Sequence, residues 1–231
     1  MKQASLQPTA EDTWRIVYDP ESRGPGYEQA LRRAQEQQNE GDIEGACNTR
    51  FAAFQALADL IPEDEDTVLD WEDRTTRSAL ELLHGSAVDH FLAGDFEMSA
   101  AMLEMLLDLD PEDHLDATRQ LAYCYVALGE WELFDEALAD VNERSVEYAL
   151  LALWAGFQRE GALPTDALAR FRGDFADYFA EFKAAEHPAD EAYLNDIESE
   201  RPSRRALARE LWLQTEHLWA AFPGFTQALA K

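Results

Sequence analysis

The chain has 231 residues, with 47 acidic against 19 basic side chains and a formal net charge of −28 at pH 7. Its hydrophobic fraction of 46% is close to that of ordinary globular proteins, so the composition excludes wholesale disorder despite the charge. A chain this negative repels nucleic-acid phosphates and anionic lipid headgroups, so we expect neither nucleic acid nor a membrane as a partner.

Lysine is scarce, and most of the cations are arginines. Two explanations stay open, namely adaptation to high salt, where screening relieves self-repulsion, and a high-GC genome combined with an acidic surface. No run of about 18 apolar residues is present and the first residues lack the apolar stretch of a signal peptide, so we expect a cytoplasmic protein. Cys47 and Cys124 lie among apolar residues at helical spacing, which predicts buried thiols and no disulfide.

Residues 1–26 predict an extended N-terminal arm. Trp14, Ile16 and Tyr18 alternate with smaller or polar residues, and Gly24-Pro25-Gly26 breaks any regular structure. The three large side chains need a surface. They fit a groove of their own chain, a homodimer contact with a second copy, or the outside of the first helical hairpin.

From Tyr27 onward the apolar residues recur at spacings of three and four, which is typical of amphipathic helices. Glycine and proline fall between these segments, and such short links favour antiparallel neighbours. The acidic run Glu63–Asp66 predicts a solvated turn, because it lacks the glycine and the ligand spacing of a calcium loop. The predicted helices cover residues 27–40, 43–61, 68–93, 96–109, 117–128, 131–141 and 147–159.

The last third, residues 164–231, predicts further helices in the same domain that cap the preceding ones. Phe171, Phe175, Tyr178, Phe179 and Phe182 form an aromatic face that Gly173 splits, and Ser203 is a favourable N-cap for a final helix.

One turn recurs along the chain. Gly41-Asp42-Ile43, Gly94-Asp95-Phe96 and Gly129-Glu130-Trp131 share the order glycine, acid, large apolar residue, and Gly161-Ala162-Leu163 is a weaker fourth copy. The intervals are 53, 35 and 32 residues. A period near 34 with a helix on each side indicates a helix-turn-helix repeat.

These residues resemble the tetratricopeptide repeat (TPR) family. The middle of the chain carries Leu83 at the family's large position, Ala87 at its small position, and a Leu109-Asp110-Pro111 ending, while Tyr125 takes the aromatic position of the next unit. Ser99 and Phe134 depart from the pattern, since each replaces a small alanine of the second helix. The resemblance implies an all-α, right-handed helical-hairpin solenoid over residues 27–163.

Motifs for catalysis are missing from the sequence, which has no GxSxG, P-loop, HExxH or GxGxxG pattern, so we expect no enzyme, no cofactor and no metal site. Asp108, Asp110, Asp113 and His114 surround Pro111, where we expect them to cap helix ends instead of binding a cation.

The resemblance instead implies a soluble adaptor that binds a protein or peptide segment on its concave face. Arginine and aromatic side chains are typical anchors for such binding, although packing in the core remains an alternative for Val88, Phe91 and Tyr123. A second function stays open, an acidic nucleic-acid mimic that binds a basic partner through its charge. The family's groove positions correspond to His84, Val88, Phe91, Arg119, Tyr123, Val126, Tyr148, Gln158 and Arg159.

Overall fold

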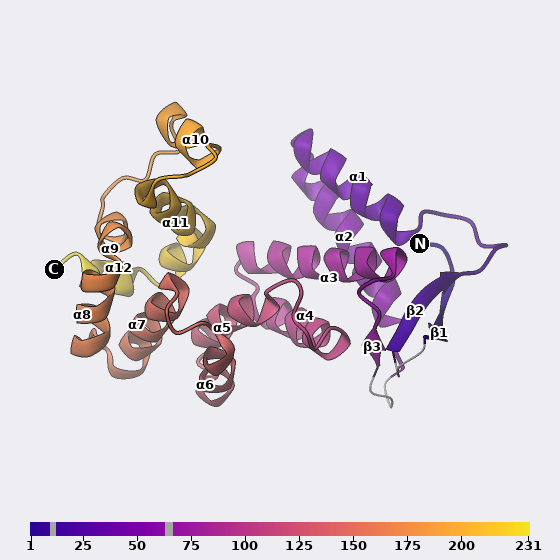
Figure 1. The fold of residues 1–231 in the computed structure, drawn as a ribbon, viewed down its shortest axis with the longest axis horizontal. Coiled ribbons are helices and arrows are strands. Elements are labelled where there is room, and N and C mark those ends of the chain that lie inside the picture. Colours follow the sequence, from indigo (N-terminus) through magenta and orange to yellow (C-terminus); the bar gives the residue numbers. More distant parts are fainter. Residues whose placement is uncertain (10–12, 63–66) are drawn as a thin grey trace. The chain divides into compact units, whose positions relative to one another are not determined.

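A computed structural model describes residues 1–9, 13–62 and 67–231 (Figure 1). Within them the chain divides into two compact units, Met1–Cys124 and Tyr125–Lys231. The predicted acidic turn at Glu63–Asp66 lies outside the described residues.

Most of the described chain is helical, and one small sheet lies near the N-terminus (Figure 1). Unit 1 contains β1 (Ala4–Pro8), β2 (Thr13–Tyr18), α1 (Tyr27–Asn39), α2 (Ile43–Ala58), β3 (Val68–Leu69), α3 (Arg74–Leu92) and α4 (Phe96–Leu109). The division between the units falls within α5 (Ala117–Leu128). Unit 2 continues with α6 (Trp131–Asp140), α7 (Val146–Glu160), α8 (Thr165–Asp174), α9 (Ala176–Phe182), α10 (Glu191–Ile197), α11 (Arg204–Ala221) and α12 (Pro223–Leu229).

The sheet corrects the prediction of an all-α fold. Strands β1 and β2 form an antiparallel pair with Leu6 opposite Ile16, so the N-terminal arm is a β-hairpin. Val68 and Leu69, expected at the start of a long helix, form β3 and pair parallel with β2. Helix α3 begins only at Arg74, because the Asp73 side chain accepts the backbone N–H of Thr76 and caps the helix there.

The arm is fixed to its own unit by β2. Ile16 is buried, and its backbone N–H donates to the Thr76 hydroxyl at 3.0 Å. The Tyr18 hydroxyl accepts the backbone N–H of Tyr27 at 2.6 Å and donates to the Glu28 carboxylate at 2.9 Å. Two of the three large arm residues therefore contact the N-terminal ends of α1 and α3.

The recurring glycine turn is a recurring backbone structure. Gly41, Gly94, Gly129 and Gly161 follow α1, α3, α5 and α7 and have φ angles of 81°, 79°, 76° and 72°. Gly41, Gly94 and Gly129 each end their helix in a Schellman motif. At the first of them, the Gly41 N–H donates to the Gln38 carbonyl and the Asp42 N–H donates to the Gln37 carbonyl, and the other two show the same pattern. Gly161 instead bonds the carbonyl four residues back, in agreement with its weaker match in sequence.

Unit 1 stacks one helical hairpin on the next. Helix α3 packs against α1, α2 and α4, and α1 packs against α2. Leu80, Leu83 and Ala87 of α3 and Leu103 of α4 are buried at these contacts. This packing of α1–α2 on α3–α4 is consistent with a helical solenoid.

Unit 2 has an aromatic core. Helix α7 packs against α8 and α12, α9 packs against α8 and α11, and α11 packs against α10 and α12. The predicted aromatic segment divides at Phe175 and not at Gly173, since α8 ends at Asp174 and α9 starts at Ala176. Ser203 caps α11 as predicted, accepting the backbone N–H of Ala206 at 3.1 Å. The largest buried side chains of this core are Trp154, Phe134, Phe171, Phe182 and Phe225.

Candidate functional site

In unit 1, the structure brings three of the predicted binding residues to one surface. His84 and Val88 lie four residues apart on α3, so they share a face of that helix, and both are partly buried. Arg119, in the first turn of α5, is half-exposed, and its charge acts on His84. We call His84, Val88 and Arg119 the α3–α5 surface.

The electrostatics of this surface centre on His84. Burial lowers the pKa of His84, and the nearby Arg119 guanidinium acts in the same direction, while the carboxylates of Asp113 and Asp116 oppose the shift. Arg119 pairs with Asp116 at 2.6 Å, and the two side chains are 37% and 65% exposed. An ion pair exposed to this degree stabilises the fold little.

Three other predicted binding residues lie in the core. Phe91 and Tyr123 of unit 1 are 6% and 3% exposed, with ring centroids 6.4 Å apart. Val126, in unit 2, is 2% exposed. Their side chains therefore serve packing, which is the alternative that the sequence leaves open for Phe91 and Tyr123.

The remaining predicted residues belong to unit 2, and Arg159 is the most strongly held. Its guanidinium lies over the Trp131 ring at 5.0 Å, donates to the Trp131 carbonyl at 3.2 Å and pairs with Asp135 at 2.7 Å. Arg159 thus attaches α7 to the start of α6. Tyr148 carries the Arg170 guanidinium over its ring at 5.3 Å, and Gln158 is half-exposed.

Unit 2 also contains a pocket that the sequence does not predict. Its volume is about 500 Å³, and it lies between α10 and the first half of α11. Tyr193 and Asp196 line one side, and Arg205 and Arg209 line the other. Asp196 is already engaged, since it accepts the hydroxyl of Ser203 at 2.6 Å.

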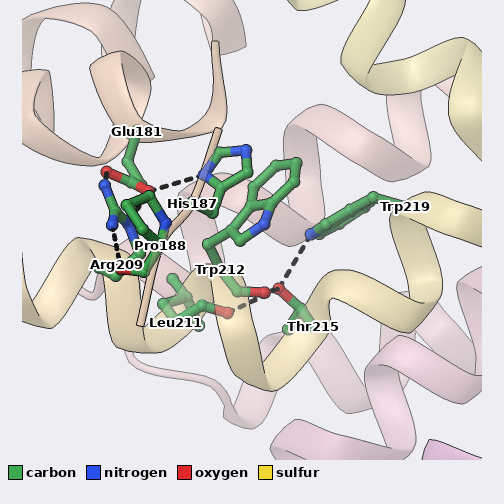
Figure 2. Close-up of polar contacts among 8 residues, drawn as sticks. All are labelled: Glu181, His187, Pro188, Arg209, Leu211, Trp212, Thr215 and Trp219. Atoms are coloured by element: carbon green, nitrogen blue, oxygen red, sulfur yellow. Dashed lines mark hydrogen bonds and ion pairs between the residues drawn. The ribbon is translucent and has the colours of Figure 1, made fainter. Parts of the chain in front are cut away.

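A buried carboxylate, Glu181, also lines this pocket, and Figure 2 shows its polar contacts. Glu181 is 7% exposed and accepts hydrogen bonds from the Arg209 guanidinium and from His187 Nδ1, the latter at 2.7 Å. Burial by itself would raise the pKa of Glu181, but the hydrogen bonds from Arg209 and His187 outweigh it and lower the pKa.

The same cluster fixes the loop that follows α9. Arg209 Nη1 donates to the Pro188 carbonyl at 2.7 Å, and the His187 ring stacks on Trp212 with centroids 3.7 Å apart. Figure 2 shows His187 and Pro188 beside the side chains of α11 that hold them. Nothing in the sequence signals this cluster, because Glu181 and Arg209 are 28 residues apart.

Among the acidic residues around Pro111, Asp113 caps the start of α5 as predicted. Asp113 accepts the backbone N–H groups of Ala117 and Thr118, and Asp110 accepts the backbone N–H and the ring Nδ1 of His114. Among residues 1–9, 13–62 and 67–231, no group of three or more His, Cys, Asp or Glu side chains is arranged to hold a metal ion. In the same part of the chain, no helix has the length and apolar character needed to cross a membrane.

Comparison of the chain with protein-family models, with curated proteins and with solved structures finds no match.

Proposed function

We propose that the protein is a TPR-like adaptor that binds a segment of a partner protein on the α3–α5 surface. The observation that carries this proposal is the meeting of His84 and Val88, both partly buried on one helix, with Arg119 on the first helix of the next hairpin. The stacking of α1–α2 on α3–α4 and the repeated Schellman turns support a right-handed TPR-like superhelix, in which such first helices line the concave face.

The chemistry of the α3–α5 surface favours a mixed apolar and acidic segment. Val88 offers an apolar contact, and Arg119 offers a planar guanidinium suited to a carboxylate. Arginine in a partly buried setting is a common anchor of protein interfaces. The chain as a whole has a net charge of −28, so the positive charge of Arg119 attracts the carboxylate of an incoming segment and thereby orients that segment.

Site-specific photocrosslinking tests this proposal. A benzophenone amino acid replaces Val88 in one variant and Ala101 in the other, since Ala101 is exposed on α4, the second helix of the same hairpin. We expect a discrete crosslinked partner from position 88 only, with the crosslink lost when Arg119→Ala is added. Equal crosslinking from both positions, or a crosslink at 88 that survives Arg119→Ala, would contradict the assignment.

The same crosslink, followed as salt is raised, separates the adaptor from a charge-driven binder. The excess of 47 acidic over 19 basic side chains supports the second function, in which the acidic surface binds a basic partner. Binding through the α3–α5 surface should persist at high salt, whereas binding driven by net charge should fall steeply.

A further inference from the structure

We propose that the protein self-associates through the open edge of β1, with two copies pairing antiparallel about Leu6 into one continuous sheet. The proposal does not depend on the binding of a partner to the α3–α5 surface. It rests on which backbone groups of the sheet already have partners, on the register of β1 and on the charge of the strand.

The far edge of β2 is already covered. In the sheet order β1-β2-β3, the Trp14 carbonyl accepts the backbone N–H of Asp70 at 2.8 Å. One step further along β2, the Ile16 N–H donates to the Thr76 hydroxyl of α3. These contacts leave β1 as the edge at which the sheet can grow.

The register of the hairpin shows which groups β1 presents outward. Asp19 N–H donates to the Gln3 carbonyl, and Thr9 N–H donates to the Thr13 carbonyl, so the odd-numbered residues of β1 bond toward β2. The backbone N–H and carbonyl groups of Ala4 and Leu6 therefore point away from β2. Among the described helices and strands, β2 is the one element that packs extensively on β1.

This edge is complementary to itself. In an antiparallel pair centred on Leu6, each Leu6 donates its N–H to the Leu6 carbonyl of the other copy, and each Ala4 N–H donates to a Pro8 carbonyl. Pro8 has no N–H to donate. Because Pro8 lies at the end of the strand, the missing N–H removes only one hydrogen bond from each copy in the dimer. A two-fold axis through Leu6 thus satisfies the donors that β1 presents.

The charges on β1 favour a second copy over a charged partner segment. The strand sequence ASLQP carries no ionised side chain, although such charges are the usual protection of an edge strand. On the solvent face, Ser5 would lie opposite Gln7 of the second copy, so no like charges meet. The net charge of −28 on each copy opposes association at long range, and salt screens that repulsion.

Sedimentation velocity of the full chain, at about 5 to 200 µM protein and at low and high salt, tests the proposal over the range in which a small interface associates. We expect a monomer–dimer equilibrium that strengthens with salt. Leu6→Pro removes the central outward donor without touching the bonds to β2, and it should raise the dimer Kd about 30-fold for two lost hydrogen bonds. Leu6→Ala is the matched control, since it shortens the side chain and keeps the N–H.

A wild-type chain that stays monomeric throughout would overturn the proposal, as would equal weakening of the dimer by Leu6→Pro and Leu6→Ala.

A crosslinking variant tests the register without a proline. Residues 5 and 7 of opposite copies form a non-hydrogen-bonded pair with Cα atoms about 4.5 Å apart, which suits a disulfide. In a Cys47→Ser background, Ser5→Cys combined with Gln7→Cys should give a covalent dimer under an oxidant such as oxidised glutathione, and Ser5→Cys alone should not. A covalent dimer from Ser5→Cys alone, with none from the double variant, would exclude this register.

Discussion

Arg50 of α2 and Asp89 of α3 form a bidentate ion pair that joins the first helical hairpin to the second. Arg50 Nε and Nη2 donate to the two carboxylate oxygens at 2.6 and 2.7 Å, and the side chains are only 12% and 16% exposed. The arginine reaches Asp89 by crossing α3 at Gly85, where an added Cβ would lie 2.6 Å from Arg50 Cδ. Gly85 can therefore be explained inside α3, because the Arg50 side chain passes directly over it.

Breaking this pair should destabilise unit 1. Arg50→Ala leaves the Asp89 carboxylate partly buried without its partner, so we expect the free energy of unfolding to fall by about 2 kcal/mol. Arg119→Ala removes an exposed pair instead and should change it by no more than about 0.5 kcal/mol. Urea denaturation followed by circular dichroism measures both. Equal effects would show that the Arg50–Asp89 pair adds nothing beyond an exposed contact.

The crossing at Gly85 gives this prediction an internal check. Gly85→Ala should destabilise the wild-type chain, because the new methyl group displaces Arg50 from Asp89. In the Arg50→Ala background the same change should stabilise by up to about 1 kcal/mol, since alanine is the better helix former. An effect of the same sign in both backgrounds would mean that Arg50 does not occupy this crossing.

A second prediction concerns the glycine turns. Gly94 has a φ of 79° and open space around its Cα, so Gly94→Ala should cost about 1 kcal/mol through backbone strain alone. Gly173 also has open space, but it lies within α8, where Gly173→Ala should stabilise by about 0.5 kcal/mol. Thermal melting of the two variants should move in opposite directions, and a shift of the same sign would contradict the turn assignment.

The repeat was predictable from sequence because it is a local structure. A glycine in the left-handed region followed by a carboxylate that caps the next helix is specified by neighbouring residues, and Asp42 and Asp95 cap α2 and α4 in this way. The helices were predictable for the same reason, since their apolar spacing is read directly. Helix starts were less secure, as Val68 and Leu69 show by forming β3.

The pairing of β3 with β2 and the polar cluster of unit 2 were not predictable, because both join residues that are distant in sequence. Strand β3 pairs with β2 although more than 50 residues separate them in the sequence. Because β3 is only two residues long, it carries no periodic pattern that would reveal a strand. Of the nine predicted binding residues, Phe91, Tyr123 and Val126 lie in the core because their helices are covered on more than one side. Single-helix periodicity does not tell a doubly covered face from a binding face.

A third prediction separates the two cysteines, both of which are free thiols. Burial raises the pKa of the Cys124 thiol to about 12, and its Sγ lies 3.5 Å from the hydroxyl of Ser99 in the core. Cys47 is half-buried, so a thiol-specific reagent at pH 8 should label Cys47 in the native chain and Cys124 only after unfolding. In Cys47→Ser, native labelling should disappear. Persistent fast labelling of that variant would contradict the burial of Cys124.

The last prediction concerns the pH dependence of unit 2. The folded-state pKa of Glu181 lies below its ordinary value of 4.5, because the hydrogen bonds from Arg209 and His187 outweigh the opposing effect of burial. A lowered folded-state pKa contributes stability above the unfolded-state pKa, and this contribution is lost as the pH falls through the folded-state value. The cluster should therefore stabilise unit 2 at pH 7, and its contribution should shrink as the pH falls below 4.5 and be lost once the pH is below the folded-state pKa.

Glu181→Gln isolates this contribution, since glutamine keeps the shape of the side chain without its charge. At pH 7 the variant should lose about 1 to 3 kcal/mol of unfolding free energy, and near pH 3.5 the difference from wild type should shrink toward zero. Tryptophan fluorescence during urea denaturation is the appropriate signal, because Trp212 stacks on His187 and Trp219 donates to Thr215 in the same helix (Figure 2). A difference that stays constant from pH 7 to pH 3.5 would show that the ionised carboxylate of Glu181 does not hold the cluster together.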